Sequence, residues 1–265
     1  MVSAHIRNLI LNCGYFVSKT SIDSEVRNVL QRLKPFETDK KLIRVGGETD
    51  GGYLIPDDLE GINYCFSPGV AQTAAFESDL AAMGIRSFLA DYSVDAPPVE
   101  SEMFRFEKKF LGSVNDSTFM TLETWVGQSL PNYSRDLILQ MDIEGGEYEV
   151  LMETPETILK KFRILIVEFH GLHAMFNDYG LKLIRFCLQK ILREFEVVHL
   201  HPNNVATPVK RGGLEIPSVI EMTFLRKDRI RWRKESAEFP HPLDRPNLPG
   251  KPDVVVTESW YRSPV

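Results

Sequence analysis

The sequence predicts an α/β fold in which a mostly parallel sheet is covered by helices on both faces. Short apolar runs alternate with helical patterns from residue 62 onward, as in chains where crossover helices join parallel strands. The last two apolar runs, 195–202 and 218–226, are joined instead by about 15 residues with no helical pattern. Such a connection favours an antiparallel final pair of strands.

The elements follow in order along the chain. Apolar residues at helical spacing predict a helix over 22–34, and two short apolar runs around 48–51 predict a β-hairpin. From there we expect strands and helices in alternation. The expected strands are 62–70, 85–92, 137–145 and 163–171, and the expected helices are 73–84, 121–130, 146–154 and 174–195. The segment 97–120 is ambiguous between helix and strand.

These patterns divide the chain into three expected regions. Residues 1–40 form an N-terminal helical segment and residues 41–235 form the α/β domain. Residues 236–265 hold six of the sixteen prolines, which excludes a long helix there. We therefore expect an extended, proline-rich C-terminal arm that packs on the core.

The composition narrows the class of protein. With 43% hydrophobic and 26% charged residues, the chain is ordinary for a globular protein, which excludes whole-chain disorder, collagen and coiled coil. A net charge of −6 argues against a nucleic-acid-binding protein with its basic surface. Three widely spaced cysteines predict neither a disulfide framework nor a zinc ribbon. The first residues fit an amphipathic helix rather than a signal peptide, and no apolar run reaches the roughly 20 residues of a membrane span. We expect a cytoplasmic protein.

The first two strands of the alternating region end in residues suited to a nucleoside. Ligands of such sheets bind outside the carboxyl ends of the strands. The first strand ends in a turn containing Ser67 and Gly69, and the second strand ends at Asp91. An acid about 20 residues after a glycine turn commonly accepts hydrogen bonds from ribose hydroxyls. The alternative is an ordinary strand-to-helix turn followed by an Asp that caps a turn; the two signals together favour a nucleoside-containing ligand.

The later strands end in carboxylates and histidines. Asp142 follows one buried run, Glu168 and His170 close the next, and His199 and His201 lie on the one after. We expect these side chains to converge in a polar active site. Oxygen and nitrogen donors of this kind can hold Mg²⁺, Mn²⁺ or Fe²⁺, or can form a metal-free acid–base network. The basic run 226–234 is interpreted as a solvated strand edge, with an anion-binding role as the alternative.

Several stretches resemble the FkbM-type methyltransferase family, within the class I S-adenosylmethionine-dependent methyltransferases. The most specific are LQMDIEGGEYEVL (139–151) and IVEFHGLH (166–173), and others are DGGYLI (50–55), SPGVAQTAAFESDLA (67–81) and LADYSVD (89–95). The resemblance implies a Rossmann-like, seven-stranded sheet with an antiparallel last strand, formed by residues 41–235. It also implies methyl transfer, usually to a hydroxyl of a sugar, polysaccharide or secondary metabolite.

The resemblance also implies roles for residues. Ser67 and Gly69 would line the methionine part of the cofactor, Asp91 the ribose and Tyr92 the adenine, with Asp142 between cofactor and acceptor. The first strand departs from the family pattern because it lacks an acid, and Ala71 replaces the second glycine of the turn. Asp50 and Glu77 are candidates to compensate.

The mechanism expected from the sequence has two versions. In the first, His170 or His199 is the base that activates the acceptor hydroxyl, with Asp142 beside it. In the second, Asp142, Glu168 and His170 bind a divalent metal ion that lowers the hydroxyl pKa. The expected partner is a small-molecule or saccharide acceptor, and the oligomeric state is open. A nicotinamide-dependent oxidoreductase and a non-catalytic binding protein are the rival classes, although SPGVAQ replaces the GxGxxG that the oxidoreductase requires.

Overall fold

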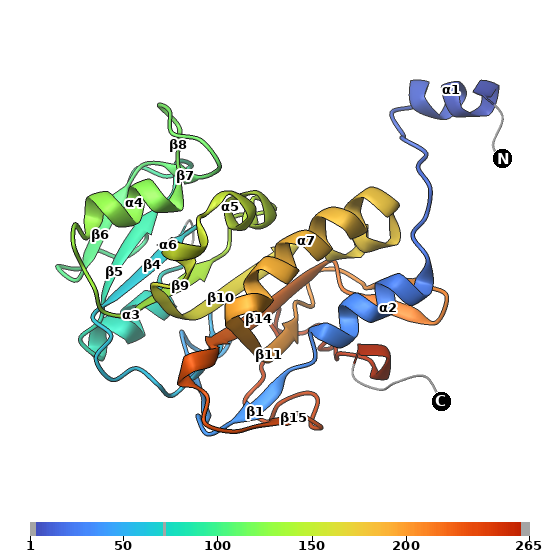
Figure 1. Cartoon of the computed structure of the whole chain (residues 1–265). Coiled ribbons are helices and arrows are strands. Elements are labelled where there is room, and N and C mark those ends of the chain that lie inside the picture. The colour runs from blue at the N-terminus through green and yellow to red at the C-terminus, as the bar shows by residue number, and fades with distance from the viewer. Residues whose placement is uncertain (1–3, 71–72, 261–265) are drawn as a thin grey trace.

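The computed structural model describes residues 4–70 and 73–260, and its centre is a seven-stranded sheet (Figure 1). Strand β14 is antiparallel to both of its neighbours, and all other neighbouring pairs are parallel. The spatial order is β11 (Phe195–Pro202), β14 (Val219–Arg226), β10 (Phe162–His170), β9 (Leu137–Met141), β4 (Tyr64–Pro68), β5 (Arg86–Ala90) and β6 (Phe104–Glu107). The predicted fold class is thereby confirmed.

The strand order reverses between β4 and β9. From β4 the chain builds outward through β5 and β6 on one side, and it then returns to start β9 on the other side of β4. The carboxyl ends of β4 and β9 therefore diverge at a topological switch point, where open α/β sheets bind ligands. The last strand, β14, lies between β10 and β11 and not at the edge beyond β11.

Helices cover both faces of the sheet, as the alternating pattern predicts. One face packs against α2 (Asp23–Arg32), α4 (Leu122–Ser129), α5 (Glu147–Glu153), α6 (Glu156–Leu159) and α7 (Asp178–Glu194). The other face packs against α3 (Ala75–Ala82) and the antiparallel hairpin of β2 (Leu42–Val45) and β3 (Tyr53–Pro56). The N-terminal helix α1 (Ala4–Asn12) stands apart from the sheet in Figure 1.

Side-chain caps fix where two of these helices begin. Thr121 accepts a hydrogen bond from the backbone N–H of Thr124 at the start of α4. Asn177 accepts from the backbone N–H groups of Tyr179 and Gly180 and so begins α7 at Asp178. The helix expected over 174–195 is consequently shorter, and the 3-10 helix η1 (Leu172–Phe176) precedes it.

The structure adds short strands where the sequence pattern is weak. The ambiguous segment 97–120 contains β6 and the parallel pair β7 (Phe110–Leu111) and β8 (Phe119–Met120). The connection between the last two sheet strands forms a hairpin of β12 (Val209–Arg211) and β13 (Leu214–Ile216). Residues 36–38 form β1 (Phe36–Thr38), paired with β15 (Arg233–Glu235), so the N-terminal segment is not wholly helical. The 3-10 helices η2 (Lys227–Arg229) and η3 (Glu258–Trp260) complete the described chain.

Several cations of the basic run are paired with protein carboxylates. Arg226 contacts Asp136 and Asp228, and Arg229 contacts Asp58. The run is not one solvated strand edge as expected, because Arg226 ends the central strand β14 and Lys227–Arg229 form η2. In the part of the chain that the structure describes, no helix has both the length and the apolarity to cross a bilayer.

Residues 236–260 contact the edge strand β11 and its neighbour β14. Asp244 contacts His199 and Asp253 contacts His201, both on β11, and Asn247 donates to Glu221 on β14. Trp260 is buried and donates its indole N–H to the carbonyl of Glu215. Ala71, Gln72 and residues 261–265, which belong to the predicted glycine turn and arm, lie outside the described residues.

The contact between the arm and His201 predicts a pH-dependent stability. Burial opposes the charge on His201, but hydrogen bonds to Asp253 and Glu221 outweigh it and raise its pKa from 6.5 to about 10. A histidine whose pKa is higher in the folded than in the unfolded chain stabilises the fold, and this contribution is complete at pH values below the unfolded-state pKa. The contribution is lost as the pH rises through about 10. We expect His201→Gln to cost about 1.5–3 kcal/mol at neutral pH.

Denaturant unfolding of both proteins between about pH 7 and the folded-state pKa of about 10 tests this expectation. The wild type should lose more stability over this range than His201→Gln, because only the wild type gives up the His201 proton. Parallel loss in the two proteins would contradict the assignment.

Candidate functional site

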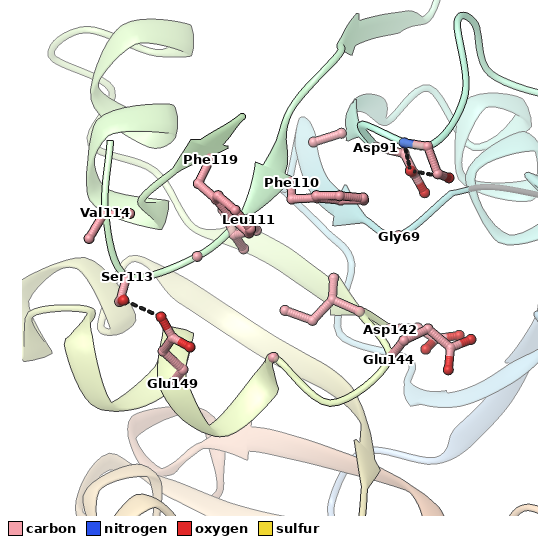
Figure 2. A pocket seen from close by; sticks show the side chains of 15 residues that line it. Gly69, Asp91, Phe110, Leu111, Ser113, Val114, Phe119, Asp142, Glu144 and Glu149 are labelled. Atoms are coloured by element: carbon pink, nitrogen blue, oxygen red, sulfur yellow. Dashed lines mark hydrogen bonds between the residues drawn. The ribbon is translucent and has the colours of Figure 1, made fainter. Parts of the chain in front are cut away.

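A cavity of about 560 Å³ opens at the carboxyl ends of β4, β5 and β9. Figure 2 shows Val114, Phe119 and Leu111 of the segment after β6 toward one side, and Asp142 and Glu144 toward the other. The lining includes Gly69, Asp91, Phe110, Leu111, Asp142, Ile143 and Glu144. The cavity therefore lies at the switch point of the sheet, where the strand ends predict a ligand.

Gly69 permits the ends of β4 and β9 to approach one another. Its φ is +94°, a conformation that side chains disfavour. A Cβ atom at this position would lie 1.5 Å from the carbonyl oxygen of Asp142. Gly69 also donates its N–H to Ala90 at the end of β5, at 2.9 Å. The predicted glycine turn is thus present, and it holds three strand ends together while it lines the cavity.

Ser67 lies beneath the cavity and not in its wall. Its hydroxyl is fully buried and contacts the carboxylate of Glu77 and the Oε1 of Gln140, the latter at 2.5 Å. Gln140 in turn donates to the hydroxyl of Tyr53 at 3.1 Å. Burial raises the pKa of Glu77, and its contact with Ser67 occupies one carboxylate oxygen. Glu77 is therefore committed to this internal network.

Asp91 is buried at the end of β5, with 4% of its surface exposed, and it lines the cavity. Its Oδ1 accepts from the backbone N–H and the hydroxyl of Ser93, at 2.7 and 2.6 Å. The carboxylate thus caps the turn, as the ordinary interpretation of the sequence predicts, and it also faces the cavity. Tyr92 is 41% exposed and packs against Phe110 with ring centroids 5.5 Å apart, so it borders the aromatic wall.

Asp142, Glu168 and His170 come together beside the cavity. One donor atom from each lies within 4.8 Å of the others. The His170 Nε2 is 4.0 Å from an oxygen of Asp142 and 4.0 Å from an oxygen of Glu168. Glu144 reaches the same nitrogen at 3.4 Å from a backbone with φ +56°, uncommon for a residue with a side chain. Glu144 and Asp142 also line the cavity, so the cluster and the cavity are continuous (Figure 2).

Glu147 fixes the orientation of the His170 ring. Its carboxylate is fully buried at the start of α5 and accepts from the backbone N–H groups of Ile143 and Gly145. The same oxygen lies 3.1 Å from His170 Nδ1. With Nδ1 directed at Glu147, Nε2 faces Asp142 and Glu168.

The pKa values in the cluster are shifted because several carboxyl groups lie close together and are largely buried. Burial raises the pKa of Asp142 to about 7; the charge of His170 opposes this shift, and nearby Glu144 and Glu147 add to it. Burial also raises the pKa of Glu168 well above its usual range, as do Asp142 and Glu221. Burial would lower the pKa of His170, but its bond to Glu147 and the surrounding carboxylates raise it instead.

The structure does not bring His199 into this cluster, contrary to the predicted convergence. Its Nε2 lies 2.8 Å from Asp244 of the arm, and His201 is held by Asp253 and Glu221. The reason is the strand order. Because β14 separates β11 from β10, the end of β11 lies two strand spacings, about 9–10 Å, from the end of β10.

The sequence interpretation also missed some site residues. Glu147 carries a signal that could have been used, since an acid in the first turn of a helix readily accepts from free backbone N–H groups. Phe110 and Leu111 lie in the ambiguous segment, whose four phenylalanines, Phe104, Phe106, Phe110 and Phe119, do not by themselves indicate which of them line a cavity.

Comparisons with known proteins identify one stretch of the chain. The Methyltransferase FkbM domain family matches residues 118–196, which include Asp142, Glu147, Glu168 and His170. The resemblance predicted from the sequence is confirmed over that stretch. None of the curated proteins matches the sequence.

Among solved structures, three with low sequence identity illustrate what the chain is similar to. Fibrillarin of a fibrillarin/Nop5p complex is 12% identical, with 63% of this chain and 74% of that chain covered and a TM-score of 0.37. The Methanococcus jannaschii fibrillarin pre-rRNA processing protein is 10% identical, with 71% and 83% covered and a TM-score of 0.36. The magnesium protoporphyrin IX methyltransferase of Synechocystis PCC 6803 with bound SAH is 13% identical, with 64% and 76% covered and a TM-score of 0.29.

The close approach at Gly69 predicts a large cost for a single added methyl group. Gly69→Ala should lower stability by the penalty for positive φ, about 1–2 kcal/mol, and by the collision with Asp142. Gly84→Ala is the matched control, because Gly84 has φ +81° and open space around its Cβ position. In urea unfolding we expect Gly69→Ala to lose roughly 1–3 kcal/mol more than Gly84→Ala. Equal losses would mean that the strand ends move apart readily.

Proposed function

We propose that this chain, with its FkbM methyltransferase domain at residues 118–196, transfers a methyl group from S-adenosylmethionine to a hydroxyl of a small-molecule or saccharide acceptor. One observation carries the proposal. The cavity at the switch point joins Asp91 at the end of β5 to the cluster of Asp142, Glu168 and His170. A nucleoside site and a polar reaction site are thus adjacent.

The cavity suits the adenosine part of the cofactor. Asp91 uses Oδ1 for Ser93, which leaves its other oxygen to accept from the ribose hydroxyls. Phe110, Leu111 and Ile143 supply apolar surface of the kind that receives an adenine ring. Tyr92 would border the adenine from outside the lining, through its contact with Phe110.

Asp50 is the better candidate to hold the methionine end. It lines a small hollow of about 40 Å³ together with Gly51, Thr73 and the residues Gly69 and Asp142 that the main cavity shares. The ammonium group of the cofactor would find the carboxylates of Asp50 and Asp142 there. Glu77 lines the same hollow but is less suited, because it is buried and its Oε1 contacts Ser67, whereas Asp50 is exposed. This arrangement would compensate for the missing acid on β4.

Methyl transfer needs alignment and an activated oxygen. The acceptor oxygen forms a bond to the methyl carbon as the bond from carbon to sulfur breaks, which leaves S-adenosylhomocysteine, and the hydroxyl proton must leave. The Asp142, Glu168 and His170 cluster lies next to the cavity where that proton would be released. We assign activation of the hydroxyl to this cluster.

Two features weigh against the nicotinamide-dependent alternative. The turn after β4 reads SPGVAQ and not GxGxxG. The sheet also carries the antiparallel strand β14 between β10 and β11, whereas the usual dinucleotide-binding order, 3-2-1-4-5-6, has no such strand.

The ribose assignment predicts a loss of cofactor affinity. Asp91→Ala should weaken the binding of S-adenosylhomocysteine by about tenfold or more, because a charge-assisted hydrogen bond of about 1.5–3 kcal/mol is removed. Asp95→Ala is the control, since this nearby acid is exposed and paired with Lys108. Titration calorimetry measures both. Unchanged binding in Asp91→Ala would refute the ribose contact, and no binding by the wild type, with NAD bound instead, would refute the proposed function.

The assignment of the reaction cluster predicts a separate loss of rate. His170→Gln should lower methyl transfer on the order of 10²–10⁴-fold while S-adenosylhomocysteine affinity stays unchanged. His199→Gln is the matched control, because His199 is paired with Asp244 outside the cluster. The measurement is transfer of labelled methyl groups from S-adenosylmethionine to small molecules and saccharides of a cell extract. Equal rates in the two variants would remove the cluster from the reaction.

A further inference from the structure

We propose that Asp142, Glu168 and His170 bind one divalent transition-metal ion, of which Mn²⁺ is the representative, and that the acceptor coordinates this ion through two neighbouring oxygens. The binding of the ion stands on the geometry of the three residues alone. Only its use in activating the acceptor rests on the proposed function.

The spacing of the three donors fits a single ion. Asp142 follows β9, and Glu168 and His170 belong to the neighbouring strand β10. Their donor atoms lie within 4.8 Å of one another, and the His170 Nε2 is 4.0 Å from each carboxylate. With bonds of about 2.0–2.2 Å, neighbouring donors around one ion are about 3–3.5 Å apart, so the three side chains would have to approach one another by roughly 1 Å. Small rotations of the side chains would complete the site.

An independent observation is that the cluster holds buried oxygens without partners. Glu168 is 4% exposed, and its Oε2 has no hydrogen-bond partner among residues 4–70 and 73–260. The Oδ1 of Asp142 is also buried and has no hydrogen-bond partner within the described chain. An unpaired buried polar atom costs about 1–3 kcal/mol, and more when the group is charged. The two carboxylates of the cluster thus each carry a buried oxygen that a bound cation would satisfy.

Neighbouring residues already orient two of the three donors, His170 and Glu168, as a metal site requires. A metal-binding histidine almost always donates its second ring N–H to a carboxylate, and Glu147 occupies that position at 3.1 Å from His170 Nδ1. Asn203 donates to the Oε1 of Glu168 at 3.0 Å and so holds this oxygen 4.0 Å from His170 Nε2. Glu147 and Asn203 are thus positioning residues.

The donor set selects the class of ion and of acceptor. Two carboxylates balance the charge of a divalent ion and suit Mn²⁺, and the imidazole favours transition metals such as Fe²⁺ or Zn²⁺ over Ca²⁺ or Mg²⁺. Three protein donors leave positions free for the substrate. An acceptor with adjacent oxygens, such as a vicinal diol of a sugar, would fill two of them and direct one hydroxyl at the methyl group.

The ion supplies the activation that the reaction needs. Coordination lowers the pKa of the bound hydroxyl, so its proton passes to a nearby base and then to water. Glu144 is suited to that role, since it is exposed and its carboxylate lies 3.4 Å from His170 Nε2. The freed electron pair of the oxygen then forms the bond to the methyl carbon.

The test is binding of MnCl₂ to the EDTA-treated, dialysed protein, measured by calorimetry and by loss of the free-Mn²⁺ electron paramagnetic resonance signal. We expect one Mn²⁺ per chain, and we expect Glu168→Gln to weaken binding at least about 100-fold, because a ligand is lost. Glu147→Gln, which only reorients His170, should weaken it by about 10–100-fold. Asp91→Ala is the matched control and should bind Mn²⁺ like the wild type. Thermal melting without metal establishes that each variant is folded.

The outcomes separate this proposal from the proposed function. No Mn²⁺ binding by the wild type at millimolar concentration, or equal binding by a folded Glu168→Gln, overturns the metal site whatever the cofactor does. Binding of Mn²⁺ without binding of S-adenosylhomocysteine upholds the metal site and removes the methyltransferase. Activity that EDTA abolishes and MnCl₂ restores supports both, and full activity after EDTA treatment overturns the role of the ion.

Discussion

The site depends on the contact between the backbone of Gly69 and the carbonyl oxygen of Asp142. These two residues end β4 and β9, the strands between which the order of the sheet reverses. Because Gly69 has no side chain, the two ends lie close enough for both residues to line the same cavity. The bond from Gly69 to Ala90 draws in the end of β5 and with it Asp91. A single contact therefore sets the distance between Asp91 and Asp142 across the cavity.

Around this contact the protein gathers more negative charge than its own cations offset. Asp50, Asp142, Glu168 and Glu221 influence one another, and His201, Asn203 and Asn247 satisfy part of the set. Concentrating carboxylates in a low-dielectric space is unfavourable unless a ligand uses them. The arrangement is therefore best understood as stability given up locally for binding, as is common at functional sites.

The sequence was sufficient to predict the position of residues that directly follow or close a single strand. Gly69, Asp91, Asp142 and His170 could be placed because each follows its own apolar run, and all of those runs are parallel. His199 could not be placed, because its position depends on β14, which comes later in the chain and inserts between β11 and β10. Glu147 and Phe110 were missed because their roles come from contacts with residues distant in sequence. The end of a strand can be predicted from the local sequence, whereas the order of the strands depends on contacts between segments far apart in the chain.

The position of β14 also has a consequence for the synthesis of the chain. Until Val219–Arg226 has left the ribosome, β10 has a free edge and β11 has no partner in the sheet. Glu168 and His170 lie on β10, and Asn203 follows β11, so the native setting of the reaction cluster can be completed only after most of the polypeptide has emerged. A nascent chain that ends before residue 226 would contain β4, β5 and β9, which form the Asp91 side of the cavity. It would lack the complete surroundings of Glu168 and His170.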